Sequence, residues 1–192
     1  MGITVDNYFE NLYSVIFSPK AFFEKNDHTI SIRVAIANIL LISSIAFITK
    51  SIFETNILHK LFFVKLFFIL LGCIITWFLT GLFFEYIAKI FNKGKKLNNI
   101  LFLTSYAPLP YIFFAPLNLL KDFGTIGYFL GSYAEFFIYL WIICLYAFSL
   151  KAAYNLTIAR AFMLIFLPFI SIFFAIYWTI CFCSKLWYIF SI

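Results

Sequence analysis

The sequence predicts an all-α polytopic membrane protein, a bundle of about five transmembrane helices preceded by a short amphipathic helix. Of its 192 residues, 65% are hydrophobic and only 11% are charged, whereas a soluble domain is roughly half apolar and about a quarter charged. The mean hydropathy is +1.02. The apolar residues also gather into uncharged runs that are long enough, as helices, to cross about 30 Å of hydrocarbon.

Residues 1–33 are predicted to form a cytoplasmic N-terminal segment with one amphipathic helix over Val5–Phe17. Apolar residues such as Phe9 and Leu12 recur on one side, and Glu10 belongs to the polar side. The polar side is acidic, so we expect this helix to lie on the membrane surface or to pack on the bundle without attraction to anionic lipid. The opening residues lack the basic start of a cleavable signal peptide, which favours a first span that stays in the protein.

Residues 34–192 are predicted to form a five-helix transmembrane domain. Only one charged residue, in the fourth run, interrupts the apolar segments. The predicted spans are Val34–Thr49, Leu66–Phe84, Leu97–Leu120, Phe123–Leu150 and Ala161–Ser184.

The basic residues between the runs indicate how the chain is oriented. With the N-terminus inside, nine of the 14 basic residues fall on the cytoplasmic side, and the outer side holds Lys50, Lys60, Lys65, Lys121 and Lys185. This bias favours a cytoplasmic N-terminus and an external C-terminus. The cytoplasmic cluster FNKGKKLNN is a topology signal or, alternatively, a contact for anionic lipid headgroups. No basic stripe with interleaved aromatic residues is present, which argues against nucleic-acid binding.

The third run contains three prolines within an apolar segment, SYAPLPYIFFAP. Pro108 and Pro110 each remove a backbone donor and disturb the preceding helical turn. Freed carbonyl groups in lipid must be satisfied by protein or water, so this segment is expected to face the bundle interior. The hydroxyls of Tyr106 and Tyr111 are candidate partners. The prolines produce either a packing kink or a broken helix whose backbone groups line a ligand or ion path.

Glu135 is the one acid inside a predicted span, and such a residue is a functional hypothesis by default. It lies 16 residues from Lys151, about 24 Å along a helix, which places it near the outer interface. It is therefore either an interfacial acid facing the bundle or Lys121, or a proton or ion site.

The remaining reactive residues do not form a catalytic or metal-binding pattern. The four cysteines lie in or beside apolar runs, where buried and inert thiols are expected. His28 and His59 fall in loops on opposite sides of the membrane. Glu85 and Lys89 are spaced for a structural i,i+4 pair. We therefore expect no enzyme, no catalytic residue, no cofactor and no metal.

Several short stretches occur in a familiar order. They are FSPKAFF before the first span, GLFFEYIAKIFNKGKK at the end of the second, SYAPLP in the third, and Trp141 followed by KAAYNLTIARA before the last. From about Phe17 to Phe169 this series resembles the Yip family, the Ypt/Rab-interacting membrane proteins, in its short prokaryotic form.

The resemblance implies five transmembrane helices and a cytoplasmic N-terminus. Eukaryotic members assist vesicle traffic and contact prenylated Rab-type GTPases, but they carry a longer hydrophilic N-terminal region than residues 1–33. GTPase contact is therefore not expected here, and a bacterial inner membrane is the expected location. The sequence favours a non-enzymatic protein that organises the lipid bilayer, membrane proteins or further copies of itself. The alternative is a small transporter or channel component that uses the broken third span.

Overall fold

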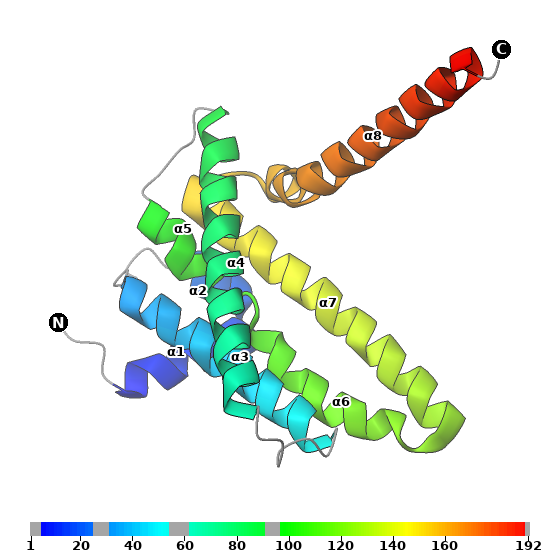
Figure 1. Ribbon diagram of the computed structural model, residues 1–192. Helices are drawn as coiled ribbons and strands as arrows, with labels where there is room; N and C mark the ends of the chain where they lie inside the picture. Colours follow the sequence, from blue (N-terminus) through cyan, green and yellow to red (C-terminus); the bar gives the residue numbers. More distant parts are fainter. Residues whose placement is uncertain (1–4, 25–30, 54–61, 91–96, 191–192) are drawn as a thin grey trace.

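The computed structural model describes residues 5–24, 31–53, 62–90 and 97–190, and every regular element within these ranges is a helix (Figure 1). Four segments are long and apolar enough to cross a membrane: Ile32–Thr49, Phe62–Lys89, Leu97–Lys121 and Gly124–Tyr154. A shorter apolar helical stretch, Ile158–Pro168, follows them and forms the start of a longer helix. The predicted polytopic helical membrane fold is confirmed.

Three of the predicted spans correspond to long continuous helices. These are α3 (Ile32–Phe53), α4 (Phe62–Ile90) and α7 (Gly124–Tyr154), and each extends beyond the predicted run at both ends or at its C-terminal end. The predicted fifth span lies within α8 (Ile158–Phe190), which contains Pro168. Figure 1 shows α8 running away from the other helices. Whether the α8 segment crosses the membrane stays a prediction.

The third predicted span is not one kinked helix but three short pieces. They are α5 (Leu97–Thr104), the 3₁₀ helix η1 (Leu109–Phe113) and α6 (Phe114–Lys121). Pro108 immediately precedes η1 and Pro110 lies inside it. The two prolines remove the donors that an α-helix would need at these positions, so the backbone closes with tighter turns. The structure therefore shows an interrupted helix at the two prolines, and the idea that its backbone groups line a ligand or ion path stays a prediction.

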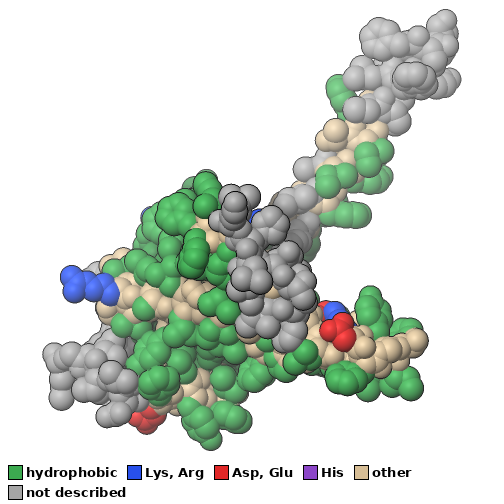
Figure 2. All heavy atoms as spheres, turned by 60° about the horizontal axis from the view of Figure 1, so that its bottom comes forward, with side chains coloured by type: hydrophobic (Ala, Val, Ile, Leu, Met, Phe, Trp, Pro, Cys, Tyr) green, Lys and Arg blue, Asp and Glu red, His purple; other side chains and the backbone are tan. Residues whose placement is uncertain are grey.

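The broken span forms the centre of the bundle. In Leu97–Lys121, 56% of the most apolar window is buried, compared with 6% for Phe62–Lys89. The buried part includes Ile100 to Ala107 without interruption. By contrast, α4 exposes most of its apolar side chains, and Figure 2 shows hydrophobic side chains in patches across the visible face. The exposed apolar surface matches a protein whose periphery faces lipid.

The N-terminal segment folds into α1 (Val5–Phe17) and α2 (Pro19–Glu24), and the first helix ends just before the Ser18-Pro19 step. The predicted helix is confirmed, and it packs on the bundle through a fully buried Val15. The predicted apolar side of this helix faces the bundle only in part, because the Phe9 side chain is 63% exposed. The Tyr8 hydroxyl lies inward and reaches α3.

Two glycines allow α6 and α7 to pack as a tight antiparallel hairpin. A Cβ atom on Gly127 would lie 2.3 Å from the carbonyl oxygen of Leu120, and one on Gly131 would lie 2.6 Å from Cγ of Lys121. The two positions form a Gly-x-x-x-Gly pattern, which typically marks close helix packing in membranes. In this protein the two glycines allow close packing inside one chain, between α6 and the first turns of α7.

Candidate functional site

A chain of hydrogen bonds joins α1, α3 and the broken third span. The Tyr8 hydroxyl donates to Oδ1 of Asn38 at 2.6 Å, and Nδ2 of Asn38 donates to Oγ of Ser105 at 3.2 Å. The Ser105 hydroxyl in turn donates to the carbonyl oxygen of Phe102 at 2.7 Å. Asn38 and Ser105 are both completely buried. A buried polar chain of this kind stabilises one arrangement of its helices because each lost partner is costly.

The backbone of the break is satisfied locally. The amide of Tyr106 bonds to the carbonyl of Leu103, and the amide of Ala107 bonds to that of Thr104. The Ser149 hydroxyl lies 2.8 Å from the carbonyl oxygen of Leu145, which is one turn earlier in α7. It also lies 3.2 Å from the carbonyl oxygen of Leu103 in α5. Freed carbonyls are therefore capped by a hydroxyl and by 3₁₀-type bonds, without a charged group.

The two tyrosines that flank the prolines do not act as the predicted carbonyl partners. The Tyr106 hydroxyl is buried beside Asn38 and Tyr8, yet it has no hydrogen-bond partner among the described residues. Its ring instead packs edge-on against Phe22 of α2, with centroids 5.1 Å apart. The Tyr111 ring packs against Tyr139 of α7, with centroids 6.2 Å apart. Both tyrosines therefore work mainly as packing residues around the break.

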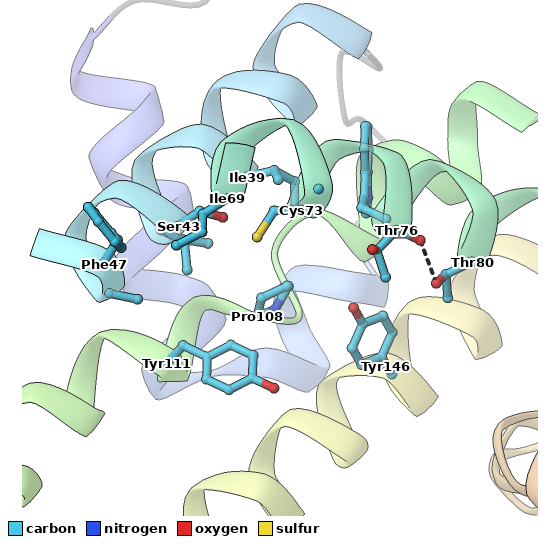
Figure 3. Close-up of a pocket in the computed structure, with 14 residues that line it drawn as sticks. Ile39, Ser43, Phe47, Ile69, Cys73, Thr76, Thr80, Pro108, Tyr111 and Tyr146 are labelled. Carbon is cyan, nitrogen blue, oxygen red and sulfur yellow. Dashed lines mark hydrogen bonds between the residues drawn. The ribbon is translucent and has the colours of Figure 1, made fainter. Parts of the chain in front are cut away.

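A cavity of about 670 Å³ lies on one side of the break, between α3, α4, η1 and α7. Pro108 and Tyr111 line it, and Figure 3 shows Pro108 opposite Cys73 of α4. Pro110 is buried and does not line the cavity. The structure thus brings four of the five predicted site residues into one region, of which two contact the cavity.

Glu135, the fifth predicted residue, lies away from this cavity in the α6–α7 hairpin. Its Oε2 is 2.6 Å from Nζ of Lys121, and both side chains are about one-fifth exposed. Lys121 also lies over the ring of Tyr128, 5.8 Å from its centroid. The contact with Lys121 is one of the arrangements that the sequence predicts for Glu135, and its position at a membrane interface stays a prediction. Within the described ranges, no three His, Cys, Asp or Glu side chains are grouped to hold a metal ion.

Sequence reasoning missed one buried polar contact, between the ends of α4 and α7. The Tyr154 hydroxyl donates to Oε2 of Glu85 at 3.0 Å, and Glu85 is only 6% exposed. Lys89 lies further away, 3.9 Å from the other carboxylate oxygen. The i,i+4 spacing identified Lys89, but no sequence pattern connects two residues 69 positions apart.

Replacing Tyr154 with phenylalanine is expected to destabilise the protein by about 1.5–3 kcal/mol, because a buried carboxylate loses its hydroxyl donor. Unfolding titrations in mixed micelles, followed by circular dichroism, measure the change. Tyr86→Phe is the matched control, since Tyr86 lies on the same helix as Glu85 and is 68% exposed. Equal stability of the two variants would contradict a stabilising role for the Tyr154 hydroxyl.

A second ion pair fixes α2 to α7. Oε1 of Glu24 is 2.7 Å from Nζ of Lys151. The hydrogen bond from Lys151 holds the pKa of Glu24 below its ordinary value of 4.5. Phe22 and Phe23, immediately before Glu24, are buried against the bundle. The ion pair between Glu24 and Lys151 therefore holds the last turn of α2 against α7.

The pair predicts a pH dependence for the docking of α2. Because the pKa of Glu24 is lowered in the folded protein, the contribution of the pair is present above about pH 4.5 and disappears as the pH falls through the lowered value. Hydrogen–deuterium exchange of Pro19–Glu24, corrected for intrinsic rates, should rise in that acidic window. The rise should be absent in Glu24→Gln, which cannot titrate at this position.

The comparison with family models gives one match. The Yip1 domain matches residues 13–179, a range that begins inside α1, includes the broken third span and its cavity, and ends inside α8. Neither the curated proteins nor the solved structures yielded a match. The matched range covers most of the chain and all four membrane-crossing segments. The chain therefore belongs to the Yip1-domain family of multi-pass integral membrane proteins.

Proposed function

We propose that this protein is a non-enzymatic member of its family that organises partner membrane proteins through α1. The observation that carries the proposal is an aromatic stripe on the outer face of this helix. Phe9, Tyr13 and Phe17 lie four residues apart and are 63%, 63% and 68% exposed. Aromatic side chains are enriched at the energetic centres of protein interfaces.

The helix that bears the stripe is held in place from behind. Its inner face is fixed by the bond from Tyr8 to Asn38 and by the buried Val15. The rings of Tyr13 and Phe17 also contact each other, with centroids 4.5 Å apart. Binding of a partner to this surface costs little conformational entropy for α1, because the helix is already in position. The acidic polar face of α1 favours a protein partner over anionic lipid.

Site-specific photo-crosslinking tests this proposal. A photoreactive amino acid at position 13, introduced into the full chain in cells, should give reproducible protein adducts, including any adduct with a second tagged copy. The same label at position 133 of α7 is the control, since Tyr133 is 66% exposed on a spanning helix. Adducts should disappear in Phe9→Ser/Phe17→Ser. Adducts to lipid alone at position 13 would contradict a protein-docking role.

The proposal also includes location and orientation. We place the chain in a bacterial inner membrane, as its resemblance to the short prokaryotic form of the family implies. The distribution of basic residues favours an N-terminus in the cytoplasm and a C-terminus outside. A phosphatase that folds only outside the cytoplasm should be active when fused after Ile192 and inactive when fused before Met1. The opposite pattern would overturn this orientation.

A small transporter or channel component is the second candidate, and the cavity beside the broken span favours it. Flux of uncharged solutes into proteoliposomes should then fall in Pro108→Ala/Pro110→Ala. Glu135→Gln tests the acid separately, because Glu135 does not line the cavity. Flux that survives both sets of substitutions would contradict this mechanism.

A further inference from the structure

The cavity beside Pro108 has the size and the lining of a ligand site. Its volume of about 670 Å³ falls within the roughly 300–1,000 Å³ of typical small-molecule pockets. Its lining residues within the described ranges include no charged side chain. Most lining side chains are apolar, and five of the lining residues carry hydroxyls: Ser43, Thr76, Thr80, Tyr111 and Tyr146. An inorganic ion or a phosphate group would find no counter-charge in this cavity.

The two tyrosine hydroxyls of the lining are available to an occupant. Thr80 already donates to the Thr76 carbonyl at 2.7 Å within α4. No hydrogen bond joins the hydroxyls of Tyr111 or Tyr146 to another residue in the described part of the chain. Figure 3 shows the Tyr146 hydroxyl pointing from α7 towards α4, into the space beneath Thr76. A hydroxyl in apolar surroundings favours an occupant that offers an uncharged acceptor, such as a carbonyl oxygen.

The cavity is accessible from the side of the bundle. Its wall on α4 includes Ile69, which is 41% exposed. Ile75 and Leu79 continue this exposed apolar surface along the same helix, at 49% and 57%. Since α4 is one of the membrane-crossing segments, these side chains face the hydrocarbon layer. Lipid can therefore enter the cavity without crossing water.

We propose that this cavity binds one acyl chain of a membrane glycerolipid, with an ester carbonyl of that lipid accepting a hydrogen bond from Tyr146 or Tyr111. The apolar wall packs against the acyl chain, and the tyrosine hydroxyls donate to the ester. Because the lining is uncharged, the phosphate headgroup stays outside the cavity. The site is independent of the docking surface on α1, so either assignment can fail without the other.

Gly72 offers a way to fill the cavity. It lines the space, and a Cβ atom at this position would meet no other atom within 4 Å. Gly72→Phe therefore places a ring in the cavity from α4. Leu79→Phe is the matched control, because it places the same side chain on an exposed part of the same helix outside the lining.

Tryptophan quenching reports whether a lipid chain occupies the site. Trp77 lines the cavity and is only 6% exposed, so bulk lipid does not reach most of its indole ring. The full chain, with Trp141, Trp178 and Trp187 changed to Phe, is reconstituted in phosphatidylcholine vesicles with plain or dibrominated acyl chains. The fluorescence intensity in dibrominated vesicles, divided by that in plain vesicles, should be low in this background and in Leu79→Phe. The same ratio should be close to one in Gly72→Phe.

Native mass spectrometry provides a second readout, with dioleoyl phosphatidylglycerol as the added lipid. One retained lipid per chain is expected, with about fivefold weaker retention in Tyr146→Phe, which removes one hydrogen bond without removing bulk. This conservative variant keeps the test decisive if Gly72→Phe does not fold. An unquenched Trp77, or lipid retention that neither substitution changes, would overturn the proposal.

Discussion

Gly127→Ala is expected to destabilise the protein by about 1–3 kcal/mol, the usual cost of forcing an extra group into a packed site. The added Cβ would lie 2.3 Å from the backbone oxygen of Leu120 and 3.0 Å from Cβ of Phe123. Backbone atoms cannot rotate away as a side chain can, so α6 and α7 must separate. The separation should also strain the ion pair between Lys121 and Glu135, which bridges the same two helices.

Two other glycines supply the controls for this prediction. At Gly131 the closest atom is Cγ of Lys121, a flexible side chain, so alanine should cost less there. At Gly72 nothing lies within 4 Å, and alanine should stabilise α4 by about 0.5–1 kcal/mol because glycine is a poor helix former. Unfolding titrations in mixed micelles should rank Gly127→Ala below Gly131→Ala and both below Gly72→Ala. Any other order would contradict the tight packing of this hairpin.

Asn38→Ala is the second substitution with a large expected effect. It removes the acceptor of Tyr8 and the donor to Ser105 in one step. Each buried polar group left without a partner costs about 1–3 kcal/mol. The loss should appear as lower stability of the whole bundle and as faster hydrogen–deuterium exchange throughout α1, because its only described side-chain hydrogen bond to α3 is gone.

A double-mutant cycle separates the two halves of this effect. Tyr8→Phe removes only the bond between α1 and Asn38, so it should release α1 with a smaller loss of overall stability. The double variant Tyr8→Phe/Asn38→Ala should lose less than the sum of the single changes, because both remove the same bond. Strict additivity would show that the Tyr8 bond contributes nothing to the attachment of α1.

The uncharged runs of the sequence predicted the helices well because lipid requires every backbone group to bond within its own segment. The prolines predicted where the third span is interrupted. They could not decide between a kink and a break, because that depends on partners such as Ser149, which lies 46 positions from Leu103. The Lys121–Glu135 pair was foreseeable, since both residues lie at one predicted membrane interface.

Other features of the site depend on contacts that a linear pattern does not contain. The polar residues of the first span gave no sign that Asn38 would become the centre of a buried chain. Periodicity alone does not show which residues of α1 pack on the bundle, because both sides of the helix carry aromatic residues. By contrast, the Gly127-x-x-x-Gly131 pattern was visible in the sequence and could have predicted the tight hairpin.

The interrupted third span also has a consequence for how the chain enters the membrane during synthesis. Its two α-helical parts, α5 and α6, contain eight residues each, about 12 Å of helix, so neither crosses the hydrocarbon layer alone. This segment also has the lowest hydropathy of the four crossing segments, 1.5. We therefore expect the insertion machinery to integrate it less efficiently than α7, whose mean hydropathy is 1.8. We expect the third span to be integrated together with α7 as a hairpin, which makes the turn at Asp122 and Phe123 a determinant of topology as well as of packing.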